Sequence, residues 1–126
     1  MPTNIRIIHA REFVRATATG ELDLEATKKV LIDIAAAAPH PGDYEILVDL
    51  RKAHSRLSHT DEWYLAAELS KHRRTFSRKT AVLCPVERLD NAEFFALCAA
   101  NAGFRVKAFT SFEDAIDWLT EPQPSA

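Results

Sequence analysis

The chain has 126 residues, of which 47% are hydrophobic and 27% charged, with 16 Lys and Arg against 18 Asp and Glu. This composition is typical of one folded domain with its own core, and it excludes collagen-like, coiled-coil and disordered chains. The formal charge of -2 argues against a domain built for nucleic acid. No apolar run approaches the length of a membrane span, and two cysteines without a visible signal peptide favour a cytoplasmic protein.

The first half of the chain is predicted to form two strands, a helix and a third strand. β-branched residues in 4–9 and 12–18 predict a hairpin, since only a few polar residues separate the two segments. Gly20 is expected to end the second strand, and Asp23 to cap a helix whose apolar stripe reaches residue 38. The apolar centre of 44–50 predicts a buried strand.

The second half alternates helix and strand. Ser58 and Asp61 have the spacing of a capping box, and the helix that follows is expected to carry Leu65, Leu69 and Phe76 inward. Residues 80–85 and 104–109 predict strands, separated by a helix that Asp90 would cap and Gly103 would end. This helix is expected to run through Phe94, Phe95, Leu97 and Cys98, with Cys98 on its inward stripe, and Ser111 is expected to cap a last helix.

The predicted order is therefore β-β-α-β-α-β-α-β-α. This alternation predicts an α/β fold with a mixed, mostly parallel sheet of about five strands, one antiparallel edge and four helices. We expect a single domain over residues 1–120 and a disordered tail over 121–126, which is polar and contains two prolines.

Motifs for cofactors and metals are not found. The three glycines form no phosphate-binding loop, so neither a dinucleotide nor a P-loop site is predicted. The five histidines lie on unrelated elements without metal-ligand spacing, and we predict solvated histidines, no metal site and no cofactor. Cys84 and Cys98 are each expected to pack in the core as small apolar side chains.

Charge is distributed unevenly along the chain. Residues 1–50 carry a net charge of -3, residues 51–86 carry +5 and residues 87–126 carry -4. The basic middle consists of two clusters, 51–56 and 71–79, which flank a predicted helix. Since this helix would be about 20 Å long, the clusters are expected at opposite ends of the molecule.

The first basic cluster lies where α/β sheets present their sites, because it follows a predicted parallel strand at its carboxyl end. The adjacent helix start favours an anion. Trp63 and Tyr64 are adjacent on the helix, so one of them is expected to be an exposed anchor for a protein partner or a homodimer. The candidate binding residues are Arg51, His54, Arg56, Ser58, His59, Thr60 and Trp63.

The segment 46–50, the polar loop after it and the helix starting near Ser58 resemble the STAS domain of anti-sigma-factor antagonists. The segments 101–104 and 109–119 are similar to the end of SpoIIAA-like proteins, which are grouped with STAS/SEC14 domains. The resemblance spans residues 4–119 and agrees with the predicted element order.

This resemblance implies a non-enzymatic bacterial module with helices mainly on one face of a mixed sheet. It also implies a kinase-like anti-sigma partner and a phosphorylated Ser or Thr at the start of the helix after the third strand. The matching positions make Thr60 and Ser58 the candidate phosphoacceptors. The sequence departs from the family here, because Asp61 stands where the family has glycine, and Ser58 is also explained as a helix cap.

Three functional hypotheses follow. The first is a regulatory protein-interaction module with an undefined partner. The second is a module that binds an anionic small molecule or a lipid head group at the basic 51–60 junction. The third is a hydrolase that uses Ser58 or Cys84 with a nearby histidine.

Overall fold

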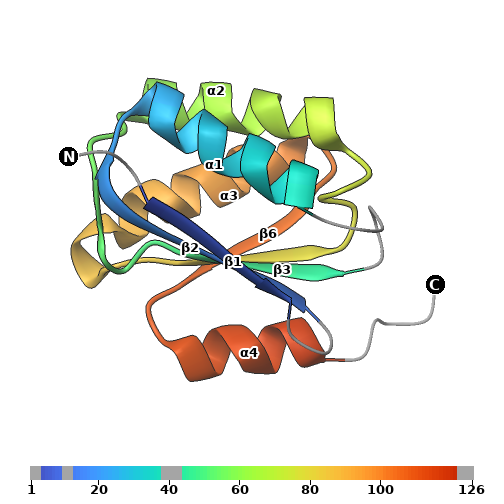
Figure 1. Cartoon of the computed structure of the whole chain (residues 1–126). Helices are drawn as coiled ribbons and strands as arrows, with labels where there is room; N and C mark the ends of the chain where they lie inside the picture. The colour runs from blue at the N-terminus through green and yellow to red at the C-terminus, as the bar shows by residue number, and fades with distance from the viewer. Residues whose placement is uncertain (1–3, 10–12, 38–43, 122–126) are drawn as a thin grey trace.

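After an initial pair of strands, helices and strands alternate along the chain, except that a second pair of strands precedes the second helix (Figure 1). The computed structural model describes residues 4–9, 13–37 and 44–121, with side chains from residue 13 onward. The strands are β1 (Asn4–His9), β2 (Phe13–Leu22), β3 (Glu45–Asp49), β4 (Ala53–Ser55), β5 (Lys79–Leu83) and β6 (Arg105–Phe109). The helices are α1 (Leu24–Ala37), α2 (His59–Leu69), α3 (Leu89–Asn101) and α4 (Phe112–Thr120), with short 3-10 turns at Ser70–His72 and Val86–Arg88.

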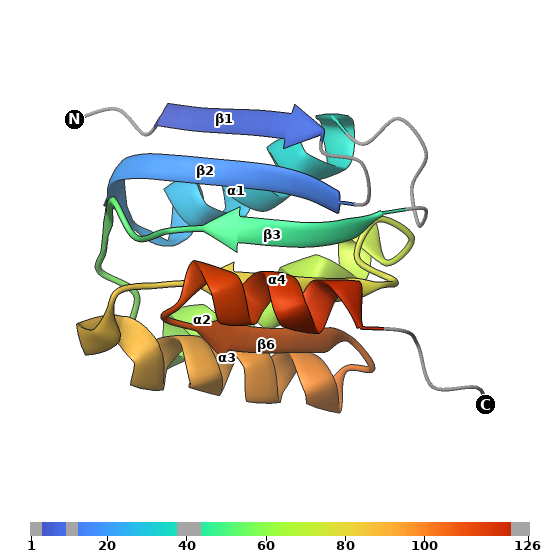
Figure 2. The same ribbon diagram turned by 90° about the horizontal axis from the view of Figure 1, so that it is seen from below.

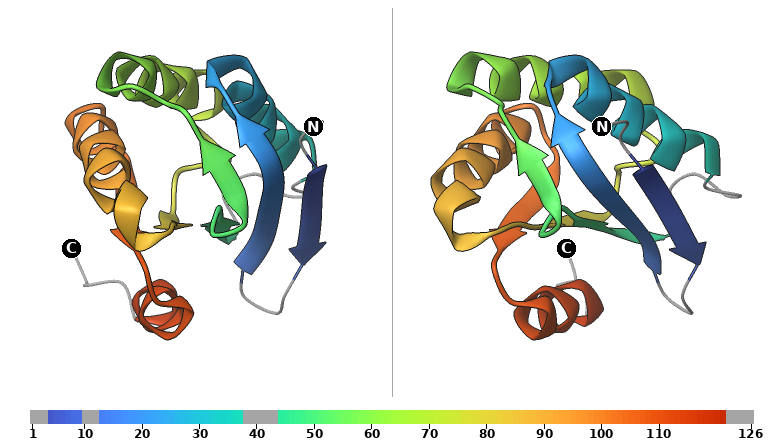
Figure 3. Two further views of the ribbon diagram at one scale, coloured as in Figure 1. Left: turned by 90° about the vertical axis from the view of Figure 1, so that its left-hand side faces the viewer. Right: turned by 60° about the vertical axis from the view of Figure 1, so that its left-hand side comes forward.

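The main sheet has the strand order β1-β2-β3-β5-β6. β1 runs antiparallel to β2, and every other neighbouring pair of strands is parallel, so the predicted mixed sheet with one antiparallel edge is confirmed. The carboxyl ends of the parallel strands point the same way, toward the viewer in the left panel of Figure 3. The loops that follow these strands are therefore gathered at one edge, which we call the carboxyl edge.

Helices cover both faces of the sheet unequally, as Figures 1 and 2 show. α1, α2 and α3 pack on one face, where the larger core cluster includes Ala16, Ile34, Val48 and Leu69. α4 packs alone on the other face against Leu47, Leu83 and other side chains of the central strands. The arrangement expected from the resemblance, with helices mainly on one face, is confirmed.

β2 is longer than predicted because a short strand that the sequence did not reveal pairs with its end. Gly20 was expected to end β2, but the strand continues to Leu22. Gly20–Leu22 pair in parallel with β4, whose residues lie within the predicted polar loop. This pairing provides backbone hydrogen-bond partners for the extension, and Gly20 has the positive φ of 89° that glycine adopts readily.

Three of the four predicted helix caps are confirmed. The Asp23 side chain accepts a hydrogen bond from the Ala26 N–H, and Ser111 accepts one from the Asp114 N–H. Ser58 and Asp61 form the complete capping box of α2. The cap predicted at Asp90 is wrong, because a 3-10 turn leads into α3, which begins at Leu89 without a side-chain cap.

The buried faces of α2 and α3 differ from the predicted stripes. α2 ends at Leu69, and Phe76 is buried in the segment beyond the following 3-10 turn. In α3, the small side chains of Ala92 and Ala99 are buried and Leu97 is 58% exposed, while Cys98, predicted to pack in the core, is half-buried. Alanines allow α3 to pack closely against the sheet and α2, which apolar spacing alone does not reveal.

No helix within the described ranges is long and apolar enough to cross a membrane. The predicted tail lies outside the described residues except for Glu121, and so do His40 and the end of the predicted first helix stripe, Ala38. The single domain over 1–120 stays a prediction.

Candidate functional site

Two segments meet at the carboxyl edge, one after β3 and one after β5. Arg88 donates a hydrogen bond from Nη2 to the Leu57 carbonyl at 2.8 Å, and Asn91 donates from Nδ2 to the same oxygen at 3.4 Å. Arg88 Nη2 also lies 3.4 Å from Ser55 Oγ. The start of α2 is thus held against the segment that leads into α3.

The predicted residues at the start of α2 lie on one exposed surface. His59, Thr60, Trp63 and Tyr64 are all exposed, and we call them the α2 surface. Trp63 is 57% and Tyr64 49% exposed, with their rings in edge contact at 5.2 Å. One side chain of this pair was predicted to be exposed, and in the structure both are. His59 stacks on Phe94 of α3 at 4.5 Å.

Ser58 has a structural role in this region. Its Oγ accepts the Asp61 N–H at 3.1 Å, and the Asp61 carboxylate accepts the Ser58 N–H at 3.0 Å. Two backbone N–H groups at the start of the helix, which have no partner within it, each gain a hydrogen bond from this exchange. Thr60, the second residue of α2, is exposed on the α2 surface.

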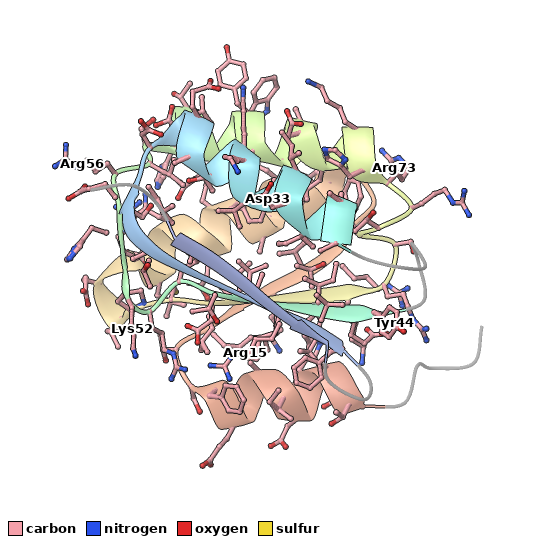
Figure 4. All side chains as sticks on the ribbon, viewed as in Figure 1. Arg15, Asp33, Tyr44, Lys52, Arg56 and Arg73 are labelled. Carbon is pink, nitrogen blue, oxygen red and sulfur yellow. The ribbon has the colours of Figure 1, made fainter. Side chains whose placement is uncertain are left out.

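Arg51 lies on the opposite face of the sheet from α2. It binds the buried Asp49 through Nε and Nη2, at 3.1 and 2.9 Å, and its guanidinium stands 5.8 Å from the ring of Phe112 at the start of α4. Arg15 also binds Asp49, at 3.1 Å, and Figure 4 shows it on the α4 side of the sheet. Burial raises the pKa of Asp49, but hydrogen bonds from Arg51 and Arg15 outweigh it and hold that pKa below its ordinary value.

The basic junction does not converge on one point. Arg56 Nε lies 2.9 Å from Glu21 Oε2, and the exposed His54 is paired in register with Glu21 across β4 and β2. In Figure 4 Arg56 and Lys52 stand apart along the carboxyl edge, and Arg73 stands at the far end, as expected for the two basic clusters. Arg51 and Arg56 each contact a carboxylate, and Lys52 stands apart from Arg56, so these charges are not gathered at one point where an anion could contact all of them.

A buried polar cluster behind the α2 surface was missed by sequence reasoning. Glu62 is only 3% exposed; its Oε1 accepts from Asn91 Nδ2 at 3.3 Å, and Arg88 lies 4.0 Å from its other oxygen. Burial raises the pKa of Glu62, since these partners only partly compensate for the lost hydration. The sequence did contain one signal for this cluster, since Arg88 and Asn91 follow the carboxyl end of the strand β5.

A cavity of about 80 Å³ lies next to this cluster, between the sheet and helices α1, α2 and α3. Its walls are mainly apolar, and they include Val30, Val48, Leu65, Val82 and Phe95. Polar side chains enter it from Thr80, Glu62, Ser55, Asn91 and Arg88.

Nucleophilic chemistry has little support in this geometry. Cys84 is buried as predicted, and burial raises the pKa of its thiol to about 11, which keeps it protonated. The Ser58 hydroxyl is used as a cap. Within the described part of the chain, no three His, Cys, Asp or Glu side chains are grouped to hold a metal ion.

Solved structures with the same architecture decide the fold. A DUF3478-family protein with a SpoIIAA-like fold from Shewanella loihica is 21% identical, with a TM-score of 0.58 over 93% of both chains. An anti-sigma factor antagonist from Mycobacterium paratuberculosis is 14% identical, with a TM-score of 0.62 over 94% of this chain and 95% of that one. The chain has a SpoIIAA-like, STAS-type fold. No family model and no curated protein sequence matches it.

The fold expected from the resemblance is thus confirmed, while the two identities are too low to transfer a function. In this chain, α2 is the helix that begins at the carboxyl edge, after β3 and β4. The aromatic pair and Thr60 belong to that helix, and the 80 Å³ cavity lies beneath it.

Proposed function

We propose that this chain is a non-enzymatic regulatory module that binds a partner protein through the α2 surface. The observation that carries the proposal is the exposure of Trp63 and Tyr64 side by side on one helix. Large aromatic side chains supply much of the binding free energy of protein interfaces. In the free protein, the exposure of two such side chains to water is unfavourable, and a partner that buries them would remove this cost.

The surroundings of the pair suit a docking surface. α2 is anchored by its capping box and by the contacts of Arg88 and Asn91 with Leu57, so the aromatic side chains are presented by a rigid element. The structurally similar protein from Mycobacterium paratuberculosis is an anti-sigma factor antagonist, which by its name acts on another protein. This supports a protein partner over a small anionic ligand, because Arg51 and Arg56 lie apart and each contact a carboxylate.

Photo-crosslinking in the organism that makes the protein tests the proposal. A benzoylphenylalanine at Ala67, exposed on α2, is expected to give one discrete adduct with another protein, identified by mass spectrometry. The matched control places the same group at Ala100, exposed on α3. Equal adducts at both positions, or an adduct only with a second copy of this chain, would contradict the proposal.

Trp63→Ala then measures the contribution of the anchor. Loss of a central aromatic side chain weakens binding by about 2 kcal/mol, or roughly thirtyfold in the Kd measured by calorimetry with the captured partner. Leu97→Ala is the matched control, since it removes a similarly exposed apolar side chain from α3. A Kd unchanged by Trp63→Ala would exclude this surface.

Phosphorylation of Thr60 is the regulatory step we attach to this surface. Thr60 is exposed beside the aromatic pair, whereas the Ser58 hydroxyl is engaged in the cap. A phosphate would bring almost two negative charges next to Asp61 and change the surface that the partner contacts. Thr60→Glu is expected to weaken partner binding severalfold in the same calorimetric assay while Thr60→Val does not; equal affinities for both variants would remove Thr60 from the proposal.

A further inference from the structure

The 80 Å³ cavity beneath α2 contains buried polar groups that its walls do not satisfy. Thr80 is 3% exposed on β5, and its Oγ1 has no hydrogen-bond partner among the described residues. Arg88 Nε is also buried and without such a partner in the described part of the chain. Both residues line the cavity. A buried polar group without a hydrogen bond costs about 1–3 kcal/mol, so native proteins rarely keep one without a purpose.

The remaining walls of the cavity are mainly apolar, and they determine what the body of a ligand must be. They come from α1, α2, α3 and the sheet, and apolar side chains predominate in them. An apolar cavity with a few convergent polar groups is the usual form of a small-molecule site. Engineered apolar cavities of about 150 Å³ bind benzene. This cavity has about half that volume and is open on one side, so it encloses about half of a benzene-sized molecule and leaves the rest at its mouth.

The cavity opens at the carboxyl edge. Most of its half-exposed lining residues belong to the two segments that meet there: Leu50, Ser55, Pro85, Arg88 and Asn91, with Phe95 further along α3. In open α/β sheets, this is the edge at which ligands enter. A molecule entering here passes Ser55, Arg88 and Asn91 first, and it meets the apolar walls and the buried Thr80 further in, since Thr80 lies toward the amino end of β5.

Charge restricts the ligand to a neutral one. Glu62 is buried at the cavity, and Arg88 is already engaged with Leu57 and lies 4.0 Å from the Glu62 carboxylate. A second anion would be repelled by Glu62, and a cation would be repelled by Arg88 and lose its hydration among apolar walls. A hydroxyl group both donates and accepts hydrogen bonds, so it can pair with Thr80 Oγ1 or Arg88 Nε.

We infer that this cavity is a binding site for a small uncharged molecule with an apolar body and one hydroxyl group. The site is distinct from the α2 surface: Glu62, Leu65 and Leu69 line the cavity from the inner face of α2, while Trp63 and Tyr64 lie on its outer face. The inference does not depend on the proposed partner.

Methyl NMR of the full chain with phenol and benzene tests the inference. Phenol is expected to saturate with a Kd of about 1 mM or lower, and to bind about tenfold more tightly than benzene because of its hydroxyl. The methyl resonances that shift should be those of the cavity walls, which include Val30, Val48, Leu65, Leu69 and Val82. Shifts that do not saturate, or that fall on other methyl groups, would overturn the inference.

Two variants separate the site from general hydrophobic binding. Ala92→Leu fills the cavity from α3 and is expected to abolish binding of both probes, while Ala100→Leu adds the same side chain on the exposed face of α3 and leaves binding intact. Thr80→Val keeps the shape of the side chain and is expected to weaken phenol severalfold without weakening benzene. Equal effects of the two leucine variants, or an unchanged preference for phenol in Thr80→Val, would contradict the proposed recognition.

Discussion

Asp49 and Glu62 are both buried carboxylates close to the carboxyl edge, but their surroundings are opposite. Asp49 is 4% exposed and accepts hydrogen bonds from Arg15, from the Arg51 side chain and from the Arg51 N–H. Glu62 is 3% exposed and has one long hydrogen bond from Asn91 and a guanidinium at 4.0 Å. The pKa of Asp49 is accordingly lowered and that of Glu62 raised.

The difference separates a buried carboxylate with several close partners from one that is only partly compensated. The Asp49 cluster joins β2 to the end of β3, and both of its guanidinium groups lie over Phe112 of α4. The Glu62 cluster borders the cavity and leaves buried hydrogen-bonding capacity unused. Incompletely paired buried groups beside a cavity are typical of functional sites. The candidate site is therefore expected on the α2 side of the carboxyl edge.

Asp49→Asn is expected to have the largest effect on stability. The amide cannot balance two guanidinium groups, and breaking a buried charged pair leads us to expect a loss of about 3 kcal/mol in the free energy of unfolding. Urea denaturation at about pH 7 measures it. Asp33→Asn is the control, since Asp33 forms an exposed pair with Lys29 and should contribute about 0.5 kcal/mol or less. Similar losses in the two variants would show that the Asp49 cluster is not structural.

The pH dependence of the wild type adds a second measurement for Asp49. Because its pKa in the folded state is below the unfolded value, its contribution is present above the unfolded pKa and is lost as the pH falls through the folded pKa. The stability difference between wild type and Asp49→Asn should therefore shrink in acid. A difference that stays constant down to about pH 2 would contradict this assignment.

Glu62→Gln should act in the opposite direction and stabilise the protein by about 1 kcal/mol near neutral pH, since it removes a poorly compensated buried charge. The raised pKa means that the stabilising contribution of the protonated Glu62 is complete below the unfolded pKa and is lost as the pH rises through the folded pKa. The gain in the variant should therefore disappear in acid, which thermal unfolding over a pH series will show.

Glu68→Gln is the matched control for Glu62→Gln. Glu68 is buried on the same helix, but it forms an ion pair with Lys71 at 3.3 Å and its other oxygen lies 3.4 Å from His72 Nε2. Its replacement is expected to cost about 0.5 kcal/mol. If both Gln variants destabilise the protein at neutral pH, Glu62 is as well compensated as Glu68, and the contrast with Asp49 fails.

Much of the fold follows from local signals in the sequence. Helical spacing, the caps at Asp23, Ser58 and Ser111, and the stop at Gly103 depend on near neighbours, and the structure confirms them. β4 and the extension of β2 past Gly20 depend on pairing between distant segments, so no local pattern reveals them. The inward face of α3 is set by alanines, whose small size matters only against a particular neighbour.

The site could be located from the sequence but not assembled from it. Parallel strands gather their carboxyl ends, which correctly places the segment after β3 at an edge. The alternation of side chains along β3 is a further signal. Leu47, Asp49 and Arg51 are two residues apart, so they are expected on the same face of the sheet, and Leu47 packs on the face that α4 covers. Arg51 could thus have been separated from the α2 residues. The contact of Glu62 with Asn91 spans 29 residues and has no local signature.

Asn91→Ala is expected to have the smallest effect and to show what limits the compensation of Glu62. Its hydrogen bonds to Glu62 and to the Leu57 carbonyl are 3.3 and 3.4 Å long, so their loss should cost about 0.5–1 kcal/mol near neutral pH. Because the bond to Glu62 favours the ionised carboxylate, the variant should raise the pKa of Glu62 further, and the loss should fall in acid. Asn101→Ala, at an exposed position of α3, corrects for helix propensity. A loss of the same size in acid would assign the role of Asn91 to Leu57 instead, and burial alone would then account for the state of Glu62.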